Sequence, residues 1–377
     1  MVSKIPDVGT SIFTVMSKMA LDCGAINLSQ GFPDFMIDDT LIGLVNRFMR
    51  EGHNQYAPMP GAPALRNAIS RVVEESFGRK VDPETEITIS SGATESIFSI
   101  ISALIGTGDE VIIFDPSYDS YNPAVRLNGG IPIHINMGDG FSIDWDLVRS
   151  KVSGATRMII INTPHNPTGA ILHEADLLQL EKIAVEFDLL VLSDEVYERL
   201  IFDDAVHQSV LRYPSLAARS LAVFSFGKTF HATGWKIGYV VAPAALTAEV
   251  RRAHQFIVFS VNTPIQLAFA EYLENPETYL RLGNFYQQKR DYFLEQIKGS
   301  SFEPIPSHGS YFQLLSYRSI SHNADVEMAR DMTRSHKVAS IPVSVFYQDK
   351  TDNRILRFCF AKKEETLEKA CAILRRL

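Results

Sequence analysis

The feature that most constrains the fold is an alternation of short apolar runs with helical patterns between about residues 60 and 245. Several of the runs are almost wholly apolar, as in strands buried on both faces. Helical stretches such as Glu95–Ile105 and Glu174–Phe187 lie between them. The alternation predicts an α/β domain with a mostly parallel central sheet. The expected strands are Glu86–Ser90, Glu110–Phe114, Ile131–Ile135, Arg157–Asn162, Leu189–Ser193, Leu221–Ser225 and Gly238–Ala242.

The pattern changes after about residue 270. A polar helical stretch at Pro276–Ile297 precedes shorter strands, and a helix with charged faces is expected at Lys363–Leu377. The shorter strands are expected at Tyr311–Leu315, Val338–Ile341 and Ile355–Phe360. A chain of 377 residues is long enough for more than one core. We therefore expect a large domain over residues 36–270 and a smaller α+β domain made of residues 1–35 and 271–377.

Composition excludes several classes of function. The formal net charge is −8 and no basic cluster occurs, which argues against a nucleic-acid partner. No apolar run approaches the roughly 20 residues that span a bilayer, and the first residues do not resemble a secretory signal. The three cysteines form no CxxC pair, and the ten histidines form no HExxH motif, so no metal site is expected. These features predict a cytoplasmic protein that binds neither nucleic acid nor membranes.

Ligands in an open α/β sheet bind beyond the carboxyl ends of the strands, so the residues after each strand are the candidates for a site. Ser91–Ser96 places small residues at a helix start, where free N–H groups favour a phosphate, although ordinary helix caps look the same. Tyr118 either stacks on a planar ring or lies in a surface turn. Asn166 lies in a turn made rigid by two prolines and a glycine, which either presents its amide or simply connects two elements.

A carboxylate and an amine follow two further strands. Asp194 ends an apolar strand, where a carboxylate is poorly solvated without a cationic partner; a helix cap and a magnesium ligand are the alternatives. Lys228 follows another buried strand and has aromatic neighbours in the sequence. Burial and a nearby cation such as Lys236 lower the pKa of an amine, and a neutral amine can form a Schiff base with an aldehyde.

The sequence Gly227-Lys228-Thr229 also occurs in the phosphate loops of nucleotide hydrolases. Such a loop needs the pattern GxxxxGK[ST], but Ala222 stands where its first glycine would be. The acidic strand also precedes the lysine, which reverses the usual order. A P-loop-like ATPase is therefore a distant alternative, and no GxSxG nucleophile elbow is present.

Together these segments resemble the class I/II aminotransferases, which are fold-type I PLP-dependent transferases. The finer resemblance is to the methionine and kynurenine–glutamine aminotransferase branch. It implies pyridoxal 5'-phosphate (PLP) as cofactor, an amino acid and a 2-oxo acid as substrates, and a homodimer. The matching segments cover nearly the whole chain: Ser29–Asp34, Gln55–Pro58, Ser91–Glu95, Asn166–Gly169, Ser193–Tyr197, Ser225–Phe230 and Leu356–Phe358.

The resemblance also implies a role for each candidate residue. Lys228 is expected to form the internal aldimine and to move a proton between the substrate and cofactor carbons. Asp194 is expected to keep the pyridine nitrogen protonated, which makes the ring an electron sink. Lys236 stands where arginine is commoner in the family. The remaining cofactor contacts implied are Tyr118, Asn166 and Tyr197 at the ring, Ser91, Gly92, Ala93, Thr94, Ser225 and Lys236 at the phosphate, and Tyr56 from the partner subunit.

Arg357 lies inside an apolar strand, where a guanidinium needs an anion. A structural salt bridge is one explanation. The resemblance supplies another, the substrate α-carboxylate held by a two-pronged contact, with Gly31 and Asn166 beside the same group.

The substrate side chain is predicted from Phe32, Tyr118 and Phe259, which suggest an apolar pocket. Such a pocket favours methionine, aromatic amino acids or glutamine over aspartate, with broad specificity. A PLP-dependent cysteine-conjugate β-lyase is the nearest alternative, because it uses the same lysine. A non-catalytic PLP-binding regulator would need a DNA-binding module, for which the chain has no spare length.

Overall fold

The central sheet of the computed structural model, which describes residues 3–377, has seven strands. They are β2 (Ile87–Ser90), β3 (Glu110–Asp115), β4 (Ile131–Asn136), β5 (Thr156–Asn162), β6 (Leu190–Asp194), β7 (Ser220–Ser225) and β8 (Gly238–Val241). Their order is β2-β8-β7-β6-β5-β3-β4, and only β8 runs antiparallel to its neighbours. The predicted α/β class is confirmed, and each predicted strand is found within one residue at either end.

The inner strands of this sheet are covered on both faces, which explains why they are mostly apolar, whereas both ends of the edge strand β4 are exposed. In β5, Ile159 and Ile161 belong to one apolar cluster, whereas Met158 and Ile160 belong to another. The first cluster includes residues of α2 (Asp39–Arg50), α3 (Pro63–Phe77), α6 (Trp145–Lys151), α7 (Glu174–Glu186), α8 (Pro214–Ala217) and α11 (Thr263–Tyr272). The second includes residues of α4 (Ala93–Leu104), α5 (Tyr121–Leu127) and α10 (Ala244–Ile257). Alternate residues of each strand therefore pack on opposite layers of helices.

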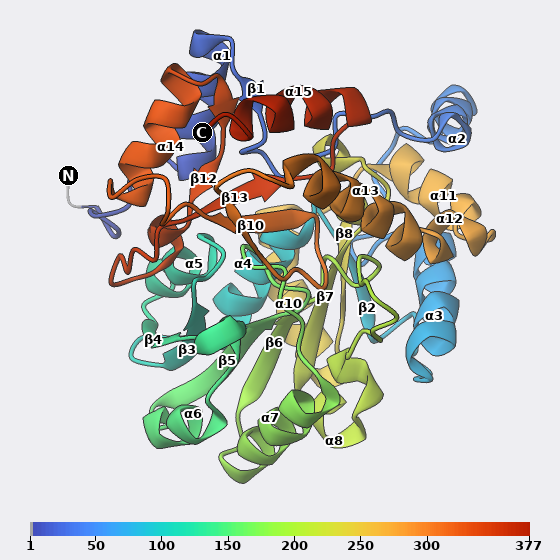
Figure 1. The fold of residues 1–377 in the computed structure, drawn as a ribbon. Coiled ribbons are helices and arrows are strands. Elements are labelled where there is room, and N and C mark those ends of the chain that lie inside the picture. The colour runs from blue at the N-terminus through green and yellow to red at the C-terminus, as the bar shows by residue number, and fades with distance from the viewer. Residues whose placement is uncertain (1–2) are drawn as a thin grey trace.

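A smaller antiparallel sheet follows in the C-terminal part of the chain. Its strands are β9 (Glu303–Ile305), β10 (Phe312–Ser316), β12 (Ile341–Pro342) and β13 (Ile355–Cys359), in the order β12-β13-β10-β9. The helices of this part, with the N-terminal helix, are α1 (Ile12–Cys23), α12 (Glu277–Leu280), α13 (Leu282–Ile297), α14 (Asp325–Arg334) and α15 (Glu364–Leu374). In Figure 1 these orange and red segments lie over one end of the central sheet, with blue α1 beside them.

Two predicted elements differ from those observed. The single strand expected at Val338–Ile341 is wrong, because the chain changes partner at Ser340. The first half, β11 (Val338–Ala339), pairs in parallel with β1 (Ile26–Asn27), and the second half, β12, joins the antiparallel sheet. The helix expected at Pro276–Ile297 is divided at Arg281 into α12 and α13, and Gly283 lies in the first turn after the break.

The N-terminal segment packs with the C-terminal part, as β1 and β11 show. A third apolar cluster joins residues of α1, α13, α14, α15, β10 and β13. It also includes Val196 and Tyr197, which directly follow β6. The predicted domain boundaries at residues 36 and 270 stay predictions, and residues 1–2 lie outside the described part. Within residues 3–377, none of the helices combines the length and the apolar character needed to cross a bilayer.

Candidate active site

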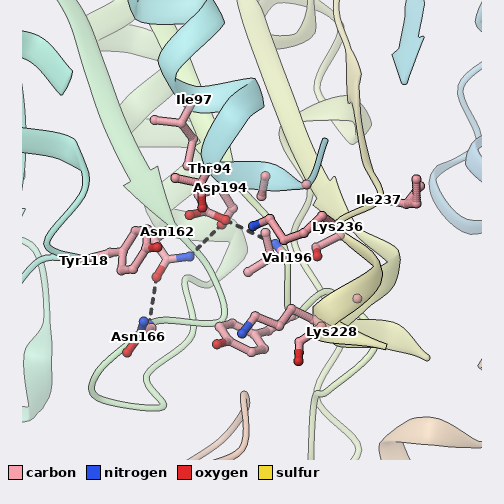
Figure 2. Close-up of a pocket in the computed structure, with 16 residues that line it drawn as sticks. Thr94, Ile97, Tyr118, Asn162, Asn166, Asp194, Val196, Lys228, Lys236 and Ile237 are labelled. Carbon is pink, nitrogen blue, oxygen red and sulfur yellow. Dashed lines mark hydrogen bonds between the residues drawn. The ribbon is translucent and has the colours of Figure 1, made fainter. Parts of the chain in front are cut away.

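A cavity of about 180 Å³ lies at the carboxyl ends of β5, β6 and β7 (Figure 2). Ten of the twelve residues predicted to bind a cofactor line it, and only Ser91 and Tyr56 do not. The full lining is Gly92, Ala93, Thr94, Ile97, Tyr118, Asn162, Asn166, Asp194, Val196, Tyr197, Ser225, Gly227, Lys228, Thr233, Lys236 and Ile237. Residues separated by more than 100 positions in the sequence thus meet where parallel strands end, as expected for an open α/β sheet.

Asp194, the last residue of β6, is 4% exposed. Its Oδ2 accepts a hydrogen bond from the Tyr121 hydroxyl at 2.6 Å, and its Oδ1 accepts one from the Val196 N–H at 3.3 Å. Burial raises the pKa of Asp194 to about 6. No lysine, arginine or histidine in residues 3–377 forms an ion pair with this carboxylate. A cation placed opposite Asp194 in the cavity would therefore stabilise its ionised form.

Lys228 lies in the short helix α9 (Phe226–Thr229), which directly follows β7. Its Nζ donates to the Tyr311 hydroxyl at 2.9 Å and to the Gly31 carbonyl at 3.2 Å. Burial lowers the pKa of Lys228 to about 8, and the charges of Arg357 and Lys236 act in the same direction. A large fraction of the amine is therefore neutral near pH 8, as a nucleophile or general base requires.

The opposite side of the cavity suits a phosphate. Helix α4 begins just after Gly92, which has a φ of 78° and provides no side-chain cap. A Cβ at Gly92 would lie 3.2 Å from both Cε and Nζ of Lys236, and residues other than glycine rarely adopt this φ, so glycine suits the position. The first N–H groups of a helix have no intrahelical partner, and the helix dipole favours an anion. These N–H groups and the Lys236 ammonium form a cradle that fits a phosphate group.

The chemistry of the donor set as a whole fits PLP. A phosphate cradle, a buried carboxylate and a weakly basic amine line one cavity, and these match the three reactive ends of that molecule. Figure 2 shows the Tyr118 ring on one wall, beside Asn162 and Asn166. Tyr197 completes the lining near Lys228 and is 2% exposed. The arrangement can hold a flat, phosphorylated aldehyde beside the lysine amine.

Arg357 is buried in β13, with 1% of its surface exposed. Its Nη1 donates to Asn166 Oδ1 at 2.7 Å, and its Nη2 donates to the Ser29 carbonyl at 2.9 Å. Its Nε has no hydrogen-bond partner among residues 3–377. Burial lowers the pKa of Arg357 to about 10.

Aromatic rings rather than carboxylates surround this guanidinium. Its Cζ lies 3.9 Å from the ring centre of Phe312, 5.1 Å from that of Phe13 and 5.5 Å from that of Phe346. No carboxylate in the described part of the chain lies within ion-pair distance of Arg357. The hypothesis that Arg357 forms a structural salt bridge is therefore wrong. A buried guanidinium with unused N–H donors is instead suited to binding an anion from outside the chain.

Of the four predicted substrate residues, Asn166 lines the cavity, whereas Gly31, Phe32 and Arg357 lie outside its lining. A Cβ at Gly31 would lie 2.7 Å from the Phe312 ring, so Gly31 permits a close approach of two segments. Phe32 is 43% exposed, and its ring centre lies 4.8 Å from Lys362 Nζ.

Two predicted cofactor residues also lie outside the lining. Tyr56 is 81% exposed, and its ring packs edge-on against Phe259 at 5.5 Å. This exposure leaves Tyr56 accessible to another subunit. The Ser91 N–H is directed instead to Glu95 Oε2, at 3.0 Å.

Three residues of the site were missed by sequence reasoning. Tyr121 and Asn162 fix Asp194, since the Asn162 amide donates to the Asp194 carbonyl at 2.8 Å. Asn162 ends a predicted strand, so its position alone was a signal that could have identified it. Tyr311 contacts Lys228, but nothing in the local sequence marks it, because Tyr311 lies just before β10 and Lys228 lies in α9, far away in the chain.

Comparison with known proteins identifies the family. The family described as aminotransferase class I and II matches residues 24–374. Methionine aminotransferase from Escherichia coli is 47% identical over 377 residues, covering 100% of this chain and 98% of the relative. A solved structure of an E. coli methionine aminotransferase, at 47% identity, superposes with a TM-score of 0.98 over 100% of this chain and 99% of that one.

More distant relatives cover the chain equally well. A probable N-succinyldiaminopimelate aminotransferase from Mycobacterium tuberculosis is 36% identical, over 100% of this chain and 97% of the relative. The mouse kynurenine–oxoglutarate transaminase 3 is 33% identical, over 99% of this chain and 89% of the relative. Family, sequence and fold agree over almost the full length, so the chain belongs to the class I and II aminotransferases, whose enzymes depend on PLP.

Proposed function

We propose that this chain binds PLP and transfers the amino group of methionine, or of another apolar, aromatic or amide amino acid, to a 2-oxo acid. One observation carries the proposal: the weakly basic Lys228 amine lines the same cavity as the buried Asp194 carboxylate, which forms no ion pair with the residues that the structure describes. An amine that is partly neutral can react with an aldehyde, and a carboxylate in this position can hold a pyridinium nitrogen.

Named residues would hold each part of the cofactor. The N–H groups of Gly92 to Thr94, with Ser225 and Lys236, would bind the phosphate. Asp194 would pair with the ring nitrogen, Tyr118 would face the ring, and Asn166 and Tyr197 would contact its hydroxyl oxygen. Bound PLP supplies an aldehyde that condenses with amines and a ring that accepts the electron pair left on the substrate Cα.

The chain's own residues bind the amino acid and move its proton. Arg357 uses one N–H for Asn166 and one for Ser29, which leaves three of its five N–H groups for an α-carboxylate. The Lys228 amine acts as the base that takes the Cα proton and then returns it to a neighbouring carbon. Because Arg357 lies among phenylalanine rings, its contact with a carboxylate would be shielded from water and strengthened.

The preference for methionine rests on similarity and on pocket chemistry. The relative at 47% identity is a methionine aminotransferase, and one at 33% is a kynurenine–oxoglutarate transaminase. An apolar pocket discriminates between apolar side chains by only about 1–3 kcal/mol, so several donors would be accepted. Aspartate would be a poor donor, because the described cavity lining offers no basic side chain for its second carboxylate apart from Lys228 and Lys236.

The test is a panel of amino donors against 2-oxo acid acceptors, followed by the absorbance of the bound cofactor. Methionine is expected to give the highest kcat/KM, with aspartate about 100-fold lower or worse. Product formation is expected to require an added 2-oxo acid. Release of ammonia and pyruvate from a cysteine conjugate without any acceptor would favour the β-lyase, and protein that stays colourless with PLP would contradict the proposal.

We also propose that the enzyme is a cytoplasmic homodimer in which Tyr56 completes the cofactor site of the partner subunit. Tyr56 is 81% exposed and does not line the cavity of its own chain. Phe259, which packs against Tyr56, is 51% exposed, and Phe256 in α10 is 86% exposed. Large apolar side chains that remain exposed in one chain commonly mark a subunit interface.

Subunit mixing tests this arrangement directly. Tyr56→Ala and Lys228→Ala homodimers are each expected to be weakly active or inactive. If Tyr56 crosses the interface, a mixed dimer carries both lesions in one site and leaves the other site intact. Equal mixing with subunit exchange should then restore roughly a quarter of wild-type activity. Mixtures no more active than the mean of the two variants would show that Tyr56 serves its own chain or neither.

A further inference from the structure

The Lys228 amine has a neighbour that belongs to neither the expected cofactor contacts nor the expected substrate contacts. Tyr311, just before β10, is 0% exposed, and its hydroxyl oxygen lies 2.9 Å from Lys228 Nζ. The Tyr311 hydroxyl also hydrogen-bonds the Gly31 carbonyl. One phenol therefore joins the N-terminal segment, the C-terminal sheet and the lysine of the large sheet.

The direction of these hydrogen bonds follows from the groups involved. A carbonyl oxygen only accepts, so the Tyr311 hydroxyl donates its proton to Gly31. Burial raises the pKa of Tyr311 well above its ordinary value, so the phenol keeps this proton. The phenol oxygen then has only lone pairs left for Lys228, and the amine must donate to it.

This pattern orients the amine. A neutral primary amine has two N–H groups and one lone pair. Lys228 donates toward Tyr311 and toward the Gly31 carbonyl, at 2.9 and 3.2 Å, which uses both N–H groups. The lone pair must therefore point away from these two acceptors. Lys228 lines the cavity, whereas Gly31 and Tyr311 do not, so the side away from these acceptors is the cavity side, from which a reacting carbon would approach.

The backbone on both sides of Tyr311 is tightly constrained. Ser310 has a φ of 64°, which is uncommon for a residue other than glycine, and its N–H donates to the Leu200 carbonyl at 2.9 Å. A Cβ at Gly309 would lie 2.7 Å from Pro164 and 2.8 Å from that same carbonyl. The Tyr311 carbonyl accepts from the Phe360 N–H at 3.1 Å. These backbone contacts fix the position of the Tyr311 ring and its hydroxyl before a substrate binds.

We propose that Tyr311 is a further catalytic residue, whose hydroxyl holds the Lys228 amine with its lone pair directed at the substrate Cα during proton transfer. The inference rests on the proposed function. The amine lone pair takes the Cα proton, which gives an ammonium with three N–H groups. Two of these stay on Tyr311 and Gly31, and the third carries the transferred proton until it is delivered to the neighbouring carbon.

The test compares Tyr311→Phe with the wild-type holoenzyme. The variant keeps the ring and removes only the oxygen. We expect kcat for methionine to fall about tenfold, as for the loss of one hydrogen bond to a reacting group, with little change in KM. With methionine deuterated at Cα, the isotope effect on kcat should increase, because proton transfer becomes slower relative to the other steps. A loss of stability alone would lower the active fraction and leave the isotope effect unchanged.

A second readout does not depend on activity. Lys228 in the apoprotein is labelled with an acylating reagent across a range of pH, and mass spectrometry gives the midpoint of the curve. An ammonium gains more than a neutral amine from a phenol acceptor, so the midpoint should move to lower pH in Tyr311→Phe. This measurement still reports on the contact if the protein binds no PLP, which separates failure of this inference from failure of the proposed function.

Tyr317→Phe is the matched control. Tyr317 is also 0% exposed and donates one hydrogen bond to a backbone carbonyl, that of Asn323, at 2.9 Å. This control should keep the wild-type kcat, isotope effect and labelling midpoint. If Tyr311→Phe folds poorly, Tyr311→Gln should be faster than Tyr311→Leu, because only glutamine offers an acceptor. Wild-type values of all three quantities in Tyr311→Phe, or equal rates in the second pair, would overturn the inference.

Discussion

Replacement of Lys228 by alanine should lower kcat for amino transfer by about 10⁴-fold or more and remove the yellow colour of the holoenzyme. Two functions are lost together. The covalent bond to the cofactor disappears, and among the described residues Lys236 is then the one lysine left in the cavity lining. General acid–base catalysis alone contributes about 10²- to 10⁴-fold, so the combined loss is expected to be larger.

The measurements are steady-state rates, the absorption spectrum and mass spectrometry after borohydride reduction. Lys362→Ala provides a matched control, because Lys362 is also a buried lysine, 3% exposed, and its Nζ donates to the Phe32 carbonyl outside the cavity. It should retain the spectrum and the reducible adduct. An adduct that persists at another residue in Lys228→Ala would refute the assignment of the cofactor lysine.

Replacement of Arg357 by alanine should raise KM for amino acids about 100- to 10,000-fold while the spectrum of the bound cofactor persists. Charge-assisted hydrogen bonds contribute about 1.5–3 kcal/mol each, and two of them would be lost with the α-carboxylate. The cavity lining does not include Arg357, so cofactor binding should be much less affected. KM for both the amino acid and the 2-oxo acid should rise, since both carry the same carboxylate.

The control separates lost packing from lost recognition. Arg290 is likewise buried, at 7% exposure, but it pairs with Asp203 and with the Ser307 carbonyl. Arg290→Ala should lower stability and leave KM near the wild-type value. Arg357→Lys should recover only part of the affinity, because an ammonium is a point charge and lacks the planar fork. An unchanged KM in Arg357→Ala would show that Arg357 does not bind the substrate α-carboxylate.

Much of the fold was predictable from the sequence because strand burial leaves a local signature. Seven apolar runs became seven strands, since a strand covered on both faces has no polar side. The site followed from the same signal, because residues such as Asp194 and Lys228 come directly after strand ends. The C-terminal part was harder to predict. Its strands are short, and the segment expected to form one strand at Val338–Ile341 pairs instead with strands of two different sheets.

The sequence by itself determined the fold class, the family and most of the residues that line the cavity, because each is encoded in apolar periodicity or in a motif beside a strand. Only the tertiary structure decided that Arg357 has no carboxylate partner within residues 3–377 and that Tyr311 contacts Lys228. Both facts depend on contacts between segments distant in the chain, such as Gly31 and Tyr311. A local sequence pattern does not encode these contacts, because they form only when packing of the two sheets brings the groups together in the folded chain.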